Sequence, residues 1–534
     1  MKSTTLTIVL LFYPLLLLSQ APAIQWQNRI GGANSNYCYA SQQTTDGGFI
    51  IGGRSNSDIS GDKTENSKGD YDYWVVKTNN LGQVVWDKTI GGASPNTWNQ
   101  DFFGAIKQTP DGGYIICGGS NSPLSGNKTE NAINDPYWDF WIVKTNAIGN
   151  IEWQNVIGGS LDEDIISLDL TQDGGYILGG YSDSSISNDK TENCRGFQDY
   201  WVVKLDGSGN VLWNKTFGGS GHDKLNSIIE TTDGGFLLGG HSDSNISGDK
   251  TENSKGNNDY WVIKLDNNGN QQWQKTIGGS GFESLSNVLQ SPDGGYFLAG
   301  YSDSPISSDK TDFCRGLYDF WVVKTDNTGN IQWQKTIGGN NQDYLISSAL
   351  CSDASYILTG HSSSAISHEK TEPLIGVFDA WVIKISESGN IIWQKTIGGS
   401  LGEALFNVIQ TNDGGYFLSG YTVSPISGDI TEEPIGLNDY WIVKLAPDNL
   451  SINENELNNN LVLYPNPVNN TLNINAKNNI EVQRISIYNT LGQLLTVIPN
   501  GLVKTIDVSH LSAGNYILKA VTNKGMLNMK FIKN

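Results

Sequence analysis

The chain has 534 residues, enough for two to four domains, with 62 glycines and only 17% charged residues. Together with 16 Trp and 22 Tyr, these values indicate a turn-rich β protein and exclude a mainly helical one. The formal net charge of −21 repels polyanions, so we expect no nucleic-acid partner.

The N-terminal segment has the features of an export signal. Lys2 precedes an apolar run from Leu6 to Leu18, and Ala21-Pro22-Ala23 follows as an A-x-A cleavage site. The sequence therefore predicts a signal peptide over 1–23 that is removed after Ala23 and directs the chain to the periplasm. No later segment reaches the ~20 apolar residues of a membrane helix, so we expect no transmembrane span in the mature chain.

An internal repeat dominates residues 24–445. A phrase of the form W-x-[KN]-x-[IF]-G-G begins at Trp26, Trp86, Trp153, Trp213, Trp273, Trp333 and Trp393, with one spacing of 67 residues and all others of 60. Each unit divides into four short segments rich in β-branched and aromatic residues, for example 286–290, 295–301, 320–324 and 331–336. Four strands in each repeated unit predict the blades of a β-propeller.

The two ends of the repeat region predict how the ring closes. The mature chain begins with a segment of the fourth type, Gln25–Ile30, and the repeats end after one of the third type, Trp441–Leu445. The fold class that we expect is therefore all-β, a seven-bladed propeller whose N-terminal strand completes the last blade, because such closure removes exposed sheet edges. Its long loops should share one face, the usual place for binding.

The second of the seven repeats is longer than the other repeats and carries the candidate binding site. Both of its insertions fall in long-face loops and add aromatic residues beside carboxylates. We expect a ligand-binding group made of Trp98, Asp101, Phe102, Phe103, Asp135, Tyr137 and Trp138. Exposed rings next to carboxylates suit stacking on sugars and hydrogen bonding to their hydroxyls. The alternative is that the insertions pack on each other, since Tyr71, Tyr318 and Phe378 occupy the place of Trp138 in other units.

We expect no catalytic motif, metal or other cofactor in the repeats. An Asp-Lys-Thr-Glu phrase, such as Asp62–Glu65, recurs in the long loops and offers oxygen ligands that could suit Ca²⁺. The lysine in its middle favours the alternative role of bracing the loop through local hydrogen bonds. His241 and His361 stand two units apart, too far along the repeat to converge on zinc.

The C-terminal part has a different pattern. An Asn- and Glu-rich linker over 446–460 leads into a β-rich segment over 461–534. Its phrases Tyr464-Pro465-Asn466-Pro467, Ile485 to Gly492 and Gly514-Asn515-Tyr516 resemble the type A C-terminal sorting domain of the Bacteroidota type IX secretion system. The resemblance implies a small β-sandwich, with the translocon and its sorting protease as partners. It also implies a protein that is released or attached at the outer cell surface. The 60-residue unit likewise resembles Gly-Gly-rich propeller-like repeats of secreted Bacteroidota proteins.

These observations favour a non-enzymatic binding or adhesion module with an extracellular glycan, or else a protein, as its ligand. One alternative is a polysaccharide-degrading enzyme in which Asp101 and Asp135 serve as acid and base. The other alternative is a purely structural surface protein.

Overall fold

The structure is a computed structural model that describes residues 19–93, 100–134, 136–448, 461–476, 482–489, 494–499, 505–522 and 525–534. The chain divides into two compact units, one over Ala21–Pro447 and one that contains Asp448–Asn534. The described residues form strands, turns and loops without a helix. The prediction of an all-β chain is confirmed.

Four strands build each blade of the first unit. The first strands are β2 (Asn36–Gln43), β6 (Asp101–Gln108), β10 (Glu163–Leu170), β14 (Asp223–Glu230), β18 (Glu283–Gln290), β22 (Asp343–Leu350) and β26 (Glu403–Gln410). The second strands are β3 (Phe49–Ser55), β7 (Tyr114–Ser120), β11 (Tyr176–Ser182), β15 (Phe236–Ser242), β19 (Tyr296–Ser302), β23 (Tyr356–Ser362) and β27 (Tyr416–Thr422). The third strands are β4 (Asp72–Thr78), β8 (Asp139–Thr145), β12 (Asp199–Leu205), β16 (Asp259–Leu265), β20 (Asp319–Thr325), β24 (Asp379–Ile385) and β28 (Asp439–Leu445). The fourth strands are β5 (Val84–Ile90), β9 (Ile151–Ile157), β13 (Val211–Phe217), β17 (Gln271–Ile277), β21 (Ile331–Ile337), β25 (Ile391–Ile397) and, for the last blade, β1 (Ile24–Ile30).

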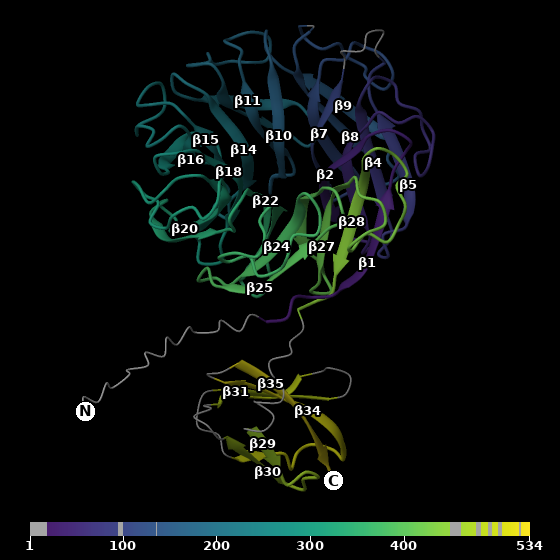
Figure 1. Ribbon diagram of the computed structural model, residues 1–534, viewed down its shortest axis with the longest axis vertical. Coiled ribbons are helices and arrows are strands. Elements are labelled where there is room, and N and C mark those ends of the chain that lie inside the picture. Colours follow the sequence, from purple (N-terminus) through teal and green to yellow (C-terminus); the bar gives the residue numbers. More distant parts are fainter. Residues whose placement is uncertain are drawn as a thin grey trace, which may run out of the picture. The chain divides into compact units, whose positions relative to one another are not determined.

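The blades form a closed ring, which confirms the predicted seven-bladed propeller. Six blades are consecutive antiparallel sheets, and the seventh has the order β1-β28-β27-β26. Ile30 pairs with Tyr440 and Arg29 with Trp441, so the first strand of the chain is the outer strand of the last blade. In Figure 1 the sheets surround a central axis, with the first strands of the blades, such as β10, β14, β18 and β22, innermost.

The third strand begins with aspartate, an aromatic residue and tryptophan in six of the seven blades, and the burial of this strand explains that pattern. All seven residues of each third strand are buried, including Trp201, Trp261 and Trp321. Where the aromatic residue is tyrosine, its hydroxyl donates a hydrogen bond to the tryptophan carbonyl of the next blade. The Tyr200–Trp261 bond measures 2.9 Å. The Tyr440–Trp74 bond, also 2.9 Å, joins blade seven to blade one. These bonds pair buried hydroxyls and fix neighbouring blades to each other.

The Gly-Gly pairs between blades are required by close approach. A side-chain carbon on Gly338 would lie 2.0 Å from Oδ1 of Asp319, the first residue of a third strand. The Asp319 carboxylate in turn accepts a hydrogen bond from the backbone N–H of Arg315 in the long loop. The glycine therefore leaves room for the aspartate that holds the loop to the blade.

The opposite face carries the short turns, each held by one ion pair. The aspartate of the Asp-Gly-Gly turn contacts the lysine of the third strand, as in Asp173–Lys204 at 2.9 Å and Asp233–Lys264 at 3.0 Å. These lysine side chains are buried, while the aspartates remain more than half exposed. The turn between the first and second strands is thus held in the same way in every blade, so we expect a specific site on the long-loop face.

The second unit is a small β domain with two sheets. One sheet has the order β29-β30-β33 and the other β32-β31-β34-β35. Their strands are β29 (Leu461–Tyr464), β30 (Thr471–Ala476), β31 (Val482–Asn489), β32 (Leu494–Pro499), β33 (Thr505–Asp507), β34 (Gly514–Thr522) and β35 (Gly525–Lys533). Buried Val468, Ile487, Val508, Leu518 and Phe531 belong to a core of this unit's own.

Candidate functional site

A channel runs through the centre of the propeller. It encloses a cavity of about 780 Å³ that is lined by residues of the first strands of all seven blades. Each first strand has a register shift against its partner, as between Ile165 and Ser167. Such a bulge bends the strand and re-aims its side chains, so two consecutive positions, here Ile166 and Ser167, both line the cavity.

One end of this channel is bordered by a group of aromatic side chains that we call the mouth cluster. The mouth cluster consists of Tyr37, Tyr39, Tyr71, Phe102, Trp138, Phe406 and Tyr421, from blades seven, one and two. Each of these residues is half-buried and therefore keeps part of its ring accessible. These residues lie near the starts of first strands, near the ends of second strands or directly before third strands. The long loops join the same ends of the strands, so the mouth cluster lies on the long-loop face.

The rings of the mouth cluster contact one another both across blade boundaries and within blade two. Tyr37 meets Tyr421 with ring centroids 5.2 Å apart, and Tyr39 meets Phe406 at 5.5 Å. Phe102 packs on Trp138 at 4.6 Å. Gly119 replaces the tyrosine or histidine of the following blades. A Cβ there would lie 3.4 Å from the Trp138 ring, which is an ordinary contact distance, so the ring lies where a larger side chain would extend.

Arg54 lies in the middle of the mouth cluster. Its guanidinium carbon is 4.3 Å from the Phe102 ring centroid, 4.8 Å from Tyr71 and 5.4 Å from Tyr37. These are cation–π distances, and Arg54 also lines the channel cavity. Burial raises the pKa of the Tyr39 hydroxyl to about 12, although the charge of Arg54 and a hydrogen bond with it act in the opposite direction. Tyr39 therefore remains a neutral hydroxyl at physiological pH.

The fold brings some residues of the predicted binding group together. Phe102 and Trp138 form the contacting pair in the mouth cluster, and Tyr137, half-buried, precedes Trp138 in the same loop. Trp98 and Asp135 lie outside the described residues. Arg54, Phe406 and Tyr421 were not predicted.

Phe103 and Asp101 have other roles than expected, because both side chains are buried in the blade. Phe103 is 7% exposed and packs in a core with its ring 5.7 Å from Tyr73. Asp101 is completely buried; it accepts hydrogen bonds from Ser120 Oγ at 2.5 Å and from the Gly92 N–H at 2.9 Å. The expectation of an exposed carboxylate at 101 is therefore wrong.

Asp101 belongs to a structural position that every blade repeats. The first residue of each first strand is buried and is Asn36 in blade one and Asp or Glu in the other six blades. Burial raises the pKa of Asp101 to about 7, and nearby Asp72 adds to the rise, while the bonds from Ser120 and Gly92 and the charge of Lys128 oppose it. This carboxyl joins the blade-to-blade segment to its own blade and does not face a ligand.

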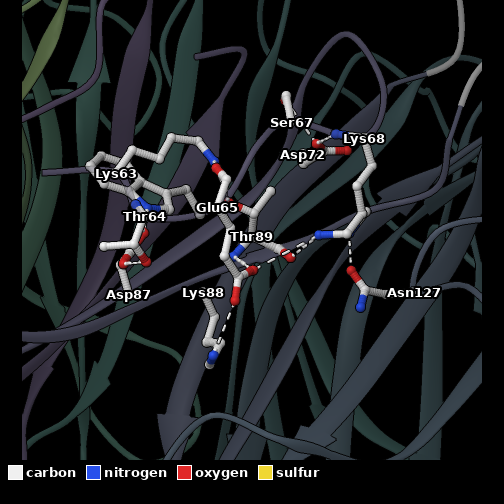
Figure 2. Close-up of polar contacts among 12 residues, drawn as sticks. Lys63, Thr64, Glu65, Ser67, Lys68, Asp72, Asp87, Lys88, Thr89 and Asn127 are labelled. Atoms are coloured by element: carbon white, nitrogen blue, oxygen red, sulfur yellow. Dashed lines mark hydrogen bonds and ion pairs between the residues drawn. The ribbon is translucent and has the colours of Figure 1, made fainter. Parts of the chain in front are cut away.

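The Asp-Lys-Thr-Glu phrase braces the long loop, as Figure 2 shows for blade one. Lys63 Nζ donates to the Thr89 hydroxyl and to the Glu65 carbonyl, and the Glu65 carboxylate accepts from the Thr89 N–H at 3.0 Å. Glu65 also forms an ion pair with Lys88 at 3.0 Å. Asp87 accepts from the Thr64 backbone N–H at 3.0 Å and from Trp74 Nε1 at 3.0 Å.

The groups of this phrase are therefore held mostly by residues of the fourth strand, Asp87, Lys88 and Thr89, as the bracing hypothesis predicted. Among the described residues, no three or more His, Cys, Asp and Glu side chains come together in a way that could hold a metal ion.

In the C-terminal unit, several residues of the motifs that resemble the sorting domain contact the last strand. Asn466 accepts a hydrogen bond from the Ile532 N–H at 2.8 Å and donates to the Lys530 carbonyl at 3.1 Å. This places the phrase Tyr464-Pro465-Asn466-Pro467 beside the last strand, with the Tyr464 side chain 49% exposed. Gly514 begins β34, and Tyr516 stacks on Phe531 at 5.5 Å. Gly492 lies outside the described residues.

Comparison with known proteins identifies this second unit. Residues 462–534 match the family model described as "Secretion system C-terminal sorting domain". This match confirms the predicted sorting domain and indicates export to the cell surface or secretion. In the described part of the chain, no helix is long and apolar enough to cross a membrane. No curated protein matches the chain.

Three solved structures illustrate what the chain is similar to at low sequence identity. A protein of unknown function from Dyadobacter fermentans has a TM-score of 0.37 at 12% identity, over 67% of this chain and 97% of that chain. The Pan2 WD40 domain of Neurospora crassa has a TM-score of 0.40 at 10% identity, over 77% of this chain and 89% of that chain. Sqt1 from Chaetomium thermophilum has a TM-score of 0.38 at 11% identity, over 95% of this chain and 100% of that chain.

Proposed function

We propose that this chain is an exported, non-enzymatic binding module that holds a glycan at the mouth cluster. The observation that carries the proposal is the gathering of half-buried rings, Phe102, Trp138 and Phe406 among them, at the edge of a channel that is lined by both polar and apolar residues. Monomeric soluble proteins seldom leave such a group of aromatic faces accessible without a ligand. Ring faces stack on the C–H faces of sugars, and amides such as Asn226 and Asn287 in the channel can bond hydroxyls.

The hydrolase alternative has weaker support. The Asp101 carboxylate is buried and accepts hydrogen bonds from Ser120 and Gly92. The carboxylates that line the cavity are Asp164 and Asp169. These two stand five residues apart on β10, which corresponds to roughly 15 Å at the usual rise of a strand. Glycosidases place their two carboxyl groups about 5–10 Å apart. Asp169 is also paired with Lys107 at 3.3 Å.

The proposal is tested by binding to immobilised polysaccharides with matched variants. We expect Trp138→Ala to weaken binding at least tenfold, because it removes the outer ring of the Phe102–Trp138 pair. The control is Phe197→Ala, which removes a 66% exposed ring that stacks on His222, away from the mouth cluster, and should leave binding unchanged.

Two results would contradict the proposal. If Trp138→Ala binds as tightly as the wild type while the melting temperature is unchanged, the ligand does not use the mouth cluster. If reducing ends accumulate when the wild-type protein is incubated with a bound polysaccharide, the chain is an enzyme.

A further inference from the structure

Arg54 breaks the symmetry of the propeller at one position. Its counterparts at the same place in the other six second strands are Gly119, Tyr181, His241, Tyr301, His361 and Tyr421. Arg54 is therefore the only cation among the seven residues at this position of the second strands. The repeat itself does not require a cation there, since the six other blades fold without one.

The other arginines of the propeller each have a carboxylate partner. Arg29 contacts Asp439 at 2.6 Å, Arg195 contacts Asp249 at 2.6 Å and Arg315 contacts Glu369 at 2.9 Å. In the part of the chain that the structure describes, Arg54 has no carboxylate oxygen within 4.0 Å, and its Nε is buried without a hydrogen-bond acceptor.

The burial of the Arg54 guanidinium without an acceptor for its Nε costs free energy unless a ligand supplies that acceptor. The rings of Phe102, Tyr71 and Tyr37 remove water from the guanidinium, and their cation–π contacts compensate for only part of that loss. A buried N–H without an acceptor adds a further penalty. An anion entering from the channel would supply the missing acceptor, because Arg54 lines the cavity.

We propose that the ligand of the mouth cluster is an acidic glycan, whose uronate carboxylate pairs with Arg54 while its sugar ring stacks on Phe102 and Trp138. This inference rests on the proposed function. The planar guanidinium suits a carboxylate because the two groups can form parallel hydrogen bonds. The rings around it would hold the sugar close to that charge.

The acidic character of the whole chain does not oppose this pairing. At physiological ionic strength, charges more than about 8 Å apart are largely screened, so the groups near the cavity decide. Two carboxylates of blade three line this cavity. Asp164 accepts a hydrogen bond from the Tyr181 hydroxyl at 3.0 Å, and the Lys224 ammonium lies 4.8 Å from the Tyr181 ring centroid. Burial raises the pKa of Asp164, while the Tyr181 hydrogen bond and the charge of Lys224 oppose the rise. Asp169 is paired with Lys107 at 3.3 Å.

The test compares acidic and neutral forms of the same sugars by calorimetric titration. The probes are trimers of galacturonic acid and of mannuronic acid, each with its methyl ester, titrated into the full chain without its signal segment. We expect the wild type to bind at least one acid about 10- to 100-fold more tightly than the matching ester, with an affinity that falls as salt rises. Arg54→Gln should bind acid and ester equally.

Lys335→Gln serves as the control, because it removes one positive charge from the outer strand β21 and leaves the mouth cluster intact. This control should retain the preference for the acid. Arg54→Lys should keep a reduced preference, since it keeps the charge but not the planar fork. Melting temperatures show whether each variant is folded.

Two outcomes separate this inference from the proposed function. If the wild type binds acid and ester equally and Trp138→Ala abolishes both, the mouth cluster binds glycans but Arg54 does not select acids, and the inference is overturned. If the wild type binds neither these probes nor any immobilised polysaccharide, both proposals fail.

Discussion

Asp101 shows how one buried carboxyl makes stability depend on pH. Its pKa in the folded protein is raised by burial to about 7, above the ordinary value of 3.8 for an aspartate. The folded state therefore binds the proton more tightly than the unfolded state, and stability falls as pH rises from about 4 to about 7. The contribution of this group over that range is on the order of 4 kcal/mol at most.

Asp101→Asn should flatten that dependence without unfolding the blade, because blade one already uses asparagine at this place. Asn36 accepts from Ser55 Oγ at 2.6 Å and donates to the Gly32 carbonyl at 3.1 Å. Thermal melts at pH 5 and pH 7.5 check this: the variant should lose less stability between the two pH values than the wild type does. Equal losses in both proteins would show that Asp101 does not carry the proton.

Whether a contact of the site could be predicted depends on how far apart in the sequence its two residues lie. Phe102 and Trp138 belong to one blade, so the sequence of that blade was enough to predict their meeting. Arg54 and Tyr421 reach the same cluster from blades one and seven, and only the closed ring brings them together. The burial of Asp101 was predictable in principle, because Glu163, Asp223 and their counterparts repeat a polar residue at that position.

At the scale of elements, β1 completes the last blade. Arg29 forms a buried ion pair with Asp439 on β28 at 2.6 Å, and Ile30 is 2% exposed. Closure was predictable because the repeat begins with a fourth strand and ends with a third. The contacts of Arg29 were not, since they join residues that are more than 400 positions apart.

Deleting residues 24–32 should therefore destabilise the whole propeller strongly. The deletion would leave Asp439 without its cation, remove Ile30 from the core and expose the backbone edge of β28. Thermal melts of the truncated and complete chains measure the effect, and Gln25→Ala, a change at an exposed position of the same strand, should be nearly neutral. An unchanged melting temperature after the deletion would contradict closure by β1.

At the scale of the whole molecule, the two units have separate roles. Blades of nearly identical construction provide a rigid ring, and the residues that break the repeat, Arg54, Gly119 and Trp138, gather at one mouth of its channel. A symmetric scaffold makes such exceptions informative, because the scaffold itself does not need them. The second unit matches a sorting domain and has its own core, so it can act independently of the ligand.

Removing residues 461–534 should accordingly leave a folded propeller that is no longer exported past the cell envelope. Every strand of the seven blades lies between Ile24 and Leu445, and each blade shares its core with neighbouring blades, so the truncated chain should melt at the temperature of the propeller in the full chain. In the native host, fractionation of cells expressing both forms checks the location. The full chain should be found at the surface or in the medium, and the truncated chain in the periplasm. As a positive control, residues 446–534 fused to an unrelated periplasmic protein should carry it to the surface. Truncated propeller in the medium at normal levels would show that the second unit is not the export signal.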